Sequence, residues 1–160
     1  MCGRYGSEIS PEQLSLLLDV PEEQSAQVIA RYNIAPTQEA PVARFAASGS
    51  RELCMLRWGL VPSWSRDATR AARLINARSE TVAEKPSYRD AYRARRCLVP
   101  ADGFYEWRRS GRARLPIHFQ RTGGLPFAFA GLWERWSSPV DGAELQTFTV
   151  LTTTANELVG

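Results

Sequence analysis

The chain has 160 residues, of which 44% are apolar and 23% are charged. This length is sufficient for one domain with a buried core, and the composition is ordinary for a soluble globular protein. The net charge of +3 is weaker than that of a dedicated DNA-packaging protein. Lys85 is the only lysine among the 20 basic residues. An arginine-rich surface suits phosphate recognition, although codon usage in a GC-rich genome explains the bias equally well.

The cysteine and histidine content excludes several kinds of site. The three cysteines, at positions 2, 54 and 97, fit neither a disulfide framework nor a zinc-binding spacing. A single histidine, His118, excludes a His-rich metal site, so we expect no metal and no cofactor. The sequence shows no secretory signal and no apolar run near the length of about 18 residues that spans a membrane. We therefore expect a cytoplasmic protein without a membrane partner.

The predicted elements are many short strands and two helices. Ser10, Pro11 and Glu12 have the features of a helix start, and residues 19–27 are predicted to form a loop. A second helix is predicted over residues 87–96, and a basic turn over residues 108–114. Strands are predicted over residues 40–45, 52–57, 97–100, 104–107, 115–120, 127–130 and 144–153. This pattern favours a mainly antiparallel, barrel-like α+β fold in a single domain that spans residues 1–160.

The first five residues, Met-Cys-Gly-Arg-Tyr, hold the most reactive group. Removal of Met1 would leave Cys2 with an α-amine of pKa roughly 7.7–8.0 beside a thiol of pKa about 8.5. Such an aminothiol can condense with an aldehyde to a Schiff base, which the thiol then closes to a thiazolidine ring. Gly3 allows a ligand to approach the backbone closely, and Arg4 places a fixed cation nearby. The alternative is that Cys2 is an ordinary residue at a frayed terminus.

Two further segments place polar side chains among apolar neighbours. If residues 74–81 are extended, Asn76, Arg78 and Glu80 share one face because alternate residues of a strand point the same way. Glu106 lies among the aromatic residues of 104–107, and burial there would raise its pKa toward that of a general acid or base. Exposure to solvent or pairing with an arginine is the alternative for Glu106.

Two tryptophans, Trp58 and Trp64, bracket a segment that contains glycine and proline. One interpretation is a loop that presents aromatic faces to unpaired nucleic-acid bases. The other is a hydrophobic lid over the core. The spacing of the two rings does not decide between these interpretations.

Several motifs occur in the order that is typical of one known family. They lie at residues 1–5, 31–36, 58–64, 74–81, 101–107 and 151–156. Together they resemble the SOS response-associated peptidase family, also called abasic-site processing proteins, from Met1 to Gly160. The resemblance implies the barrel-like α+β fold of that family and binding to single-stranded DNA that contains abasic sites. We expect a monomer that is associated with the nucleoid when it is bound to DNA.

The resemblance also implies a role for individual residues. Members of the family form a covalent cross-link to abasic sites through the cysteine exposed by methionine removal, which corresponds to Cys2. Matching motifs place Asn76 and Glu106 in the active site, where Glu106 would transfer protons and Asn76 would hold the sugar or the cysteine. The residues implied to bind DNA are Gly3, Arg4, Asn33, Trp58, Trp64 and Arg78.

One motif of the family is missing from this sequence. The family carries a catalytic histidine in a His-x-Arg-Met-Pro segment, but the sequence ends at Gly160 before any such segment, and His118 does not match it. We therefore expect a fragment or a truncated product whose fold lacks its closing strands. The family name implies peptidase or hydrolase activity, with lyase activity in addition. Two other functions stay open, namely a thiol peptidase or autoprocessing hydrolase that uses Cys2, and a non-covalent single-strand-binding module.

Overall fold

The computed structural model describes residues 2–157, except for the side chains of residues 70–72. Its helices are α1 (Pro11–Leu18), α2 (Glu22–Ser25) and α3 (Arg89–Ala94), with 3-10 turns η1 (Ala68–Arg73) and η2 (Thr122–Gly124). Its strands are β1 (Arg4–Ser7), β2 (Arg31–Ile34), β3 (Glu39–Phe45), β4 (Arg51–Trp58), β5 (Asn76–Arg78), β6 (Arg96–Ala101), β7 (Gly103–Ser110), β8 (Ala113–Gln120), β9 (Phe127–Ser137) and β10 (Glu144–Thr152). No helix of the described residues is both long enough and apolar enough to cross a bilayer.

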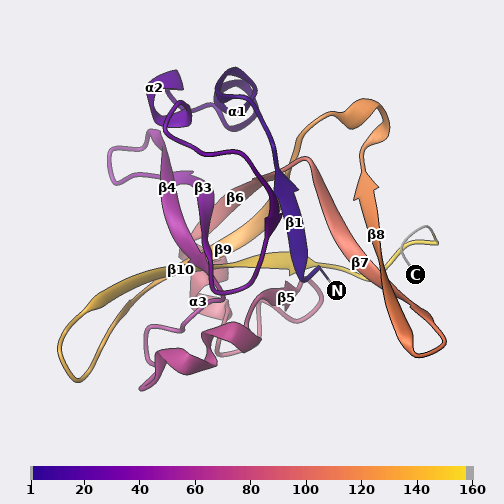
Figure 1. Cartoon of the computed structure of the whole chain (residues 1–160). Coiled ribbons are helices and arrows are strands. Elements are labelled where there is room, and N and C mark those ends of the chain that lie inside the picture. Colours follow the sequence, from indigo (N-terminus) through magenta and orange to yellow (C-terminus); the bar gives the residue numbers. More distant parts are fainter. Residues whose placement is uncertain (1, 158–160) are drawn as a thin grey trace.

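Five strands close into a barrel in the order β4-β3-β6-β9-β10 (Figure 1). The neighbours along this order pair antiparallel, and the barrel closes where β10 pairs parallel to β4. Strand β5 continues along the same edge of β10, where Val150 lies opposite Asn76. The structure confirms the barrel-like, mainly antiparallel α+β fold expected from the sequence.

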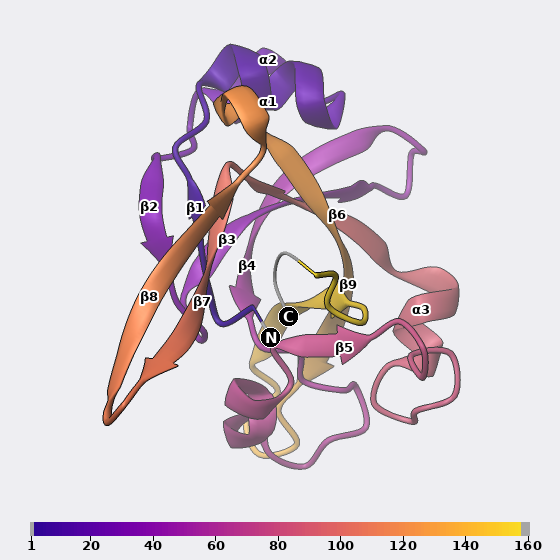
Figure 2. The same ribbon diagram turned by 90° about the vertical axis from the view of Figure 1, so that its right-hand side faces the viewer.

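A second sheet, in the order β2-β1-β7-β8, lies against one side of the barrel. Strand β1 is central and pairs antiparallel with both β2 and β7, so the start of the chain is held on two edges. Strands β7 and β8 form a long hairpin that points away from the rest of the molecule in both views (Figures 1 and 2). Since β1 begins just after Cys2, this sheet determines where the reactive terminus lies.

Aromatic rings fill the middle of the barrel. Trp58, Tyr5 and Phe148 are fully buried. The ring of Tyr5 meets Trp58 edge-on at 5.2 Å between centroids, and Trp58 stacks on Phe148 at 6.3 Å. Because Tyr5 comes from β1 and the other two rings come from barrel strands, these contacts fix the second sheet against the barrel.

Helix α1 confirms the predicted helix start. The Ser10 hydroxyl accepts from the Gln13 backbone N–H, and the Gln13 side chain accepts from the Ser10 N–H in return. The predicted loop over residues 19–27 is partly wrong, because it contains α2. The Gln24 side chain accepts from the Leu53 N–H at 2.7 Å, and Ser25 is buried. This short helix is therefore stabilised by tertiary contacts that a local sequence pattern does not reveal.

The largest correction to the predicted strands concerns β9. The expected strand over residues 127–130 continues to Ser137, through Trp133 and Trp136. It is this long because β6 pairs with its first half and β10 with its second half. The predicted basic turn is also wrong, since all but two of its residues belong to β7 or β8.

Candidate functional site

Cys2 lies at one mouth of the barrel, where β1 begins beside β5 (Figure 2). Only 6% of the residue is exposed, so it is not part of a frayed end. Its thiol donates to the Arg4 carbonyl oxygen at a sulfur–oxygen distance of 3.6 Å. The Asn76 side-chain amide donates to the Cys2 carbonyl oxygen at 2.7 Å. The backbone of Cys2 is thus held between β1 and β5.

Asn76 is itself held from several directions. Its strand β5 pairs with β10, and the Tyr88 hydroxyl donates to the Asn76 carbonyl oxygen at 3.1 Å. The Trp58 indole N–H donates to the preceding carbonyl oxygen, that of Ile75, at 2.9 Å. The Oδ1 atom of Asn76 is buried and accepts no hydrogen bond from any described residue. Since buried polar atoms are nearly always paired, this acceptor is suited to a ligand or to a second donor.

Glu106 acts electrostatically on the Cys2 thiol. Arg4 lies opposite Tyr105 in the pairing of β1 with β7, which brings the next residue of β7, Glu106, close to Cys2. Burial raises the pKa of the Cys2 thiol to about 12, and the negative charge of Glu106 contributes in the same direction. The thiol is therefore protonated at neutral pH. A reaction of Cys2 must begin at another atom or include removal of this proton.

Arg4 and Asn33 meet on the second sheet. The Arg4 guanidinium donates to the Asn33 Oδ1 at 2.9 Å. Gly3 lies beside the Trp107 ring, since a Cβ built on Gly3 would be 4.0 Å from that indole. Arg78 ends β5, two residues after Asn76, and is exposed. The structure thus brings the segment from Cys2 to Arg4 together with residues from three other parts of the sequence, around Asn33, Asn76 and Glu106.

The chain has the motif order and the fold of known proteins. A family model described as SOS response associated peptidase (SRAP) matches residues 1–160. The chain belongs to this family. Abasic site processing protein YoqW of Bacillus subtilis is 40% identical over 164 residues, which cover 99% of this chain and 71% of the relative. Abasic site processing protein HMCES of Xenopus tropicalis is 29% identical over 192 residues, covering 95% of this chain and 57% of the relative.

Solved structures agree with this family membership. A protein from Bordetella bronchiseptica has a TM-score of 0.78 and 28% identity, over 98% of this chain and 74% of that chain. A protein from Bacteroides thetaiotaomicron has a TM-score of 0.76 and 28% identity, over 96% of this chain and 70% of that chain.

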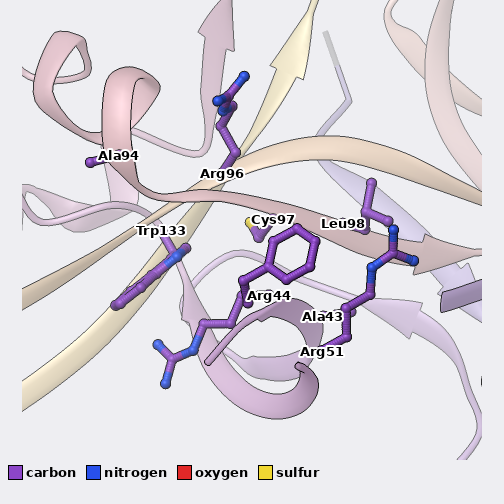
Figure 3. A pocket seen from close by; sticks show the side chains of 9 residues that line it. Ala43, Arg44, Arg51, Ala94, Arg96, Cys97, Leu98 and Trp133 are labelled. Atoms are coloured by element: carbon purple, nitrogen blue, oxygen red, sulfur yellow. The ribbon is translucent and has the colours of Figure 1, made fainter. Parts of the chain in front are cut away.

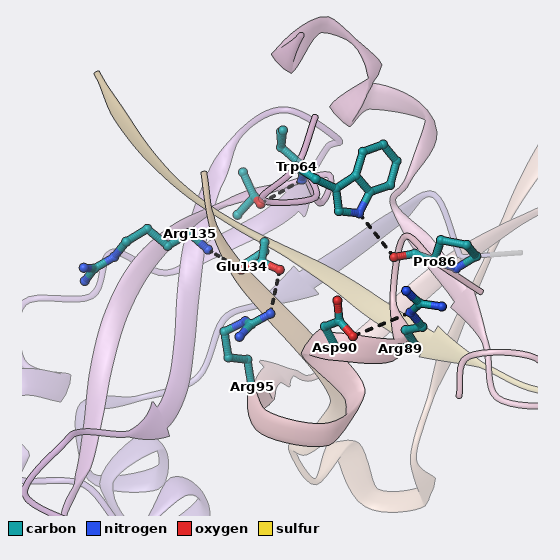
Figure 4. A network of polar contacts seen from close by, with 9 residues as sticks. Trp64, Pro86, Arg89, Asp90, Arg95, Glu134 and Arg135 are labelled. Carbon is teal, nitrogen blue, oxygen red and sulfur yellow. Dashed lines mark hydrogen bonds and ion pairs between the residues drawn. The ribbon is translucent and has the colours of Figure 1, made fainter. Parts of the chain in front are cut away.

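The two tryptophans of the SRAP motif at residues 58–64 have different environments. Trp58 is 0% exposed within the barrel core, so its ring offers no face to a base. The expectation that Trp58 contacts DNA by stacking therefore does not fit this structure. Trp64 is 60% exposed, and its indole N–H donates to the Pro86 carbonyl oxygen at 3.4 Å (Figure 4). Only Trp64 of the pair is placed to contact a ligand.

The expected shared face of Asn76, Arg78 and Glu80 is also partly wrong. Strand β5 ends at Arg78, and Glu80 lies in the following turn. The Glu80 carboxylate accepts from the Thr153 hydroxyl and the Thr154 N–H, both at 3.0 Å. These bonds connect the turn after β5 to the segment after β10. The hydrogen bond from the backbone of Glu80 itself, and then the bonds from Thr153 and Thr154, lower the pKa of the Glu80 carboxyl. Glu80 therefore has a structural role.

Trp107 was not among the site residues predicted from sequence. It is 41% exposed and lies next to Gly3, on the face of β7 opposite to that of Glu106. On the same face, the Tyr105 and His118 rings stack at 4.5 Å. Strand alternation alone could have predicted the position of Trp107. If the Glu106 side chain points toward the barrel, the next side chain of β7 points to the other face of the sheet.

A cavity of about 370 Å³ lies away from Cys2, near the other mouth of the barrel. Figure 3 shows its lining, which includes Arg44, Arg51 and Arg96 around Cys97. Arg44 donates a hydrogen bond to Gln146 of β10. Val150, which pairs with Asn76, lies four residues further along this strand, a distance of about 13 Å. None of the predicted site residues lines this cavity.

The described residues contain no cluster of three or more His, Cys, Asp or Glu side chains that could hold a metal ion. The three cysteines are not paired in disulfides.

Proposed function

We propose that this SRAP protein processes abasic sites in single-stranded DNA by forming a thiazolidine cross-link through Cys2 after removal of Met1. The main support is the position of Cys2, which is buried at a barrel mouth with its carbonyl bonded to Asn76 and with Glu106 nearby. The curated relatives are named abasic site processing proteins, which agrees with this proposal.

The reaction begins at the amine. A thiol with a pKa of about 12 has very little thiolate at neutral pH, whereas an α-amine of pKa roughly 8 has a substantial neutral fraction. The amine adds to the aldehyde carbon of the ring-opened sugar, and loss of water gives a Schiff base. The thiol then adds across the C=N bond, with sulfur going to carbon and the proton to nitrogen. No oxidant or reductant is needed.

Glu106 and Asn76 assist different parts of this reaction. Glu106 transfers protons during the loss of water and the ring closure, which need a base and an acid in turn. Asn76 fixes the cysteine backbone through its amide N–H. Its buried Oδ1 accepts a hydrogen bond from the Cys2 amine or from a sugar hydroxyl, which would satisfy the atom that has no partner among the described residues.

The DNA is held by residues around this mouth. Arg4, oriented by Asn33, and the exposed Arg78 contact the phosphates on either side of the abasic sugar. Gly3 leaves room for the sugar beside the chain, and the exposed rings of Trp64 and Trp107 stack on flanking bases. Phosphate contacts make the binding dependent on salt and independent of sequence.

Intact-mass spectrometry tests this proposal. The purified protein is measured before and after incubation with a single strand that carries one abasic site. We expect a mass without Met1 and a DNA adduct that survives denaturation. The Cys2→Ser variant should not give this stable adduct, whereas Cys97→Ser, which changes another buried cysteine, should. A stable adduct of equal yield in Cys2→Ser would show that the thiazolidine mechanism is wrong.

The thiol-peptidase alternative makes a different prediction. A cysteine peptidase needs a thiolate at working pH, and burial opposes its formation at Cys2. If the protein nevertheless cleaves peptides, Cys2→Ser should abolish cleavage and leave DNA binding unchanged. A plain single-strand-binding module would bind intact and abasic strands equally and form no adduct.

A further inference from the structure

The barrel wall has an opening between β3 and β6 that takes no part in the proposed cross-linking reaction. Among the described residues these two strands pair at a single position, Ala43 opposite Leu98, although β3 pairs with β4, and β6 with β9, along the whole of β3 and of β6. The cavity of about 370 Å³ lies at this opening, lined by residues 43–45 of β3 and 96–98 of β6 (Figure 3). Small-molecule sites have volumes of roughly 300–1,000 Å³, so this cavity is large enough for a ligand.

The lining of the β3–β6 opening is positively charged. It includes Arg44, Arg51 and Arg96, and no acidic side chain of the described chain lines it. Arg44 is already paired, because it donates to Glu52 and to Gln146. Arg44 therefore forms a structural wall, and the charge that is available to a ligand comes from Arg51 and Arg96.

These two arginines have donors to spare. Arg51 donates to the Leu18 carbonyl oxygen at 2.9 Å, and its ion pair with Asp19 is long, at 3.8 Å, and exposed. Within the described chain, Arg96 forms no ion pair and no side-chain hydrogen bond. A guanidinium presents a planar fork of N–H donors that suits the oxygens of a phosphate. Two such forks match the two charges and three terminal oxygens of a phosphate monoester.

The opening also presents an aromatic surface. The Phe45 residue is 64% exposed, and the Arg51 guanidinium lies over its ring at 5.4 Å from the centroid. Phe45 and Arg51 are directly opposite in the pairing of β3 with β4, so this cation and this ring belong to one surface. An exposed aromatic ring beside cations is suited to a ligand that has a flat base, because bases stack on aromatic side chains.

We propose that the β3–β6 opening binds a nucleoside monophosphate, with the phosphate between Arg51 and Arg96 and the base against Phe45. Arg51 and Phe45 come from one side of the opening and Arg96 from the other. The ligand thus connects β3 and β6 where their backbones are not paired, and it stabilises the folded protein. This site does not use Cys2, and its occupation is independent of the cross-linking reaction.

Isothermal titration calorimetry with three probes tests the proposal. The probes are deoxyadenosine monophosphate, deoxyadenosine and inorganic phosphate. The test variants are Arg96→Gln and Phe45→Ala, which change exposed side chains, and circular dichroism checks that they are folded. The matched control is Arg93→Gln, which removes the same charge from an exposed position on α3 outside the lining. Arg4→Gln is a second control, because a nucleotide could bind instead at the proposed DNA site.

We expect the unchanged protein to bind the nucleotide more tightly than the nucleoside or inorganic phosphate, since each of these provides only one of the two contacts. Arg96→Gln should weaken nucleotide binding by roughly tenfold, because a hydrogen bond between charged groups is lost. Phe45→Ala should weaken it by about tenfold through the loss of stacking and leave phosphate binding unchanged. Arg93→Gln and Arg4→Gln should bind the nucleotide within about twofold of the unchanged protein.

Several results would overturn the proposal. Absence of nucleotide binding at millimolar concentration would do so, as would equal affinity for the nucleotide and inorganic phosphate. A loss in Arg4→Gln but not in Arg96→Gln would place the nucleotide at the proposed DNA site. The adduct yield of Arg96→Gln with an abasic single strand reports the proposed function separately and should equal that of the unchanged protein. A lower yield would show that the two sites are not independent.

Discussion

At one mouth of the barrel, the Arg44 guanidinium donates to Glu52 at 2.8 Å and to Gln146 at 2.7 Å, and it lies 4.0 Å from the centre of the Trp133 ring. At the Cys2 mouth, the Asn76 Oδ1 is buried without a partner among the described residues. The hydroxyl of Tyr5, in the core cluster that contains both Cys2 and Cys97, is also buried and unpaired within that part of the chain. The Arg44 side chain is therefore paired within the protein, whereas the Asn76 acceptor beside Cys2 has no partner among the described residues.

This difference separates a structural network from a functional one. A buried polar network that is fully hydrogen-bonded stabilises a unique core, whereas an unpaired buried group costs free energy. The two ends cannot be told apart by their thiols, because Cys2 and Cys97 are each 6% exposed and burial raises the pKa of both. The two sites differ in the groups around each thiol. Cys2 is beside the Asn76 amide and the Glu106 charge, whereas Cys97 is beside Arg44, which is bonded to Glu52 and Gln146.

The strongest test of this comparison is Asn76→Ala. We expect the rate of adduct formation to fall by roughly 100-fold, because a reacting group displaced by about 1 Å loses that much. The free energy of unfolding should change by less than about 1 kcal/mol, since the loss of one bond to Cys2 is offset by the loss of an unpaired acceptor. Quenched-flow gels measure the rate and urea titration the stability. A normal rate would mean that Asn76 does not position Cys2.

The opposite result is expected for Arg44→Met. This change leaves Glu52 without its cation and should cost about 2 kcal/mol of unfolding free energy. The adduct rate at a temperature where the variant is folded should stay within about twofold of the unchanged protein, because Arg44 is at the far mouth. Glu52→Gln, which keeps an acceptor for Arg44, is the milder control. A large loss of rate in folded Arg44→Met would show that the two mouths are coupled.

The barrel-like fold was predictable because most strands alternate apolar and polar residues and are separated by turns. The closure of the barrel could not be predicted, because β10 pairs with β4 between residues that are 90 positions apart in the sequence, Arg57 and Thr147. The contact between Asn76 and Cys2 is equally non-local, and only the resemblance to a family joined them in advance. A local pattern does not encode which distant strands become neighbours.

The tryptophans show the same limit within one motif. Trp58 and Trp64 have the same chemistry and are separated by a few residues, but one fills the core and the other is exposed. The difference arises because Trp58 is still part of β4, whose inward face continues to the end of the strand. Gly59 follows with a φ of 121°, so regular alternation stops there and cannot be extended to Trp64.

Alkaline pH should lower the free energy of unfolding, because the folded protein keeps the buried thiols of Cys2 and Cys97 protonated. The folded protein holds the Cys2 proton up to a pKa of about 12, whereas the unfolded chain releases it near the ordinary value of 9.0. The unfolded chain therefore binds fewer protons in this window, and stability falls as pH rises, by at most about 1.4 kcal/mol per pH unit for each thiol. Urea titrations from pH 8 to 10.5 should show a shallower decline for Cys2→Ala and for Cys97→Ala. Unchanged slopes would mean that neither thiol is protonated more strongly in the folded state.

The smallest expected effect is that of Tyr5→Phe. The ring contacts with Trp58 are kept, and only a buried hydroxyl without a partner among the described residues is removed. We expect the free energy of unfolding to rise by up to about 1 kcal/mol, because an unpaired buried polar group is removed at constant shape. Thermal and urea unfolding measure this, with Tyr88→Phe as the control, since the Tyr88 hydroxyl donates to Asn76 and its removal should destabilise the protein.

A loss of stability in Tyr5→Phe similar to that in Tyr88→Phe would show that the Tyr5 hydroxyl has a hydrogen-bond partner in the free protein. Of these two atoms, only the Asn76 Oδ1 would then remain as an unpaired buried acceptor, and the comparison with the Arg44 network would rest on Asn76.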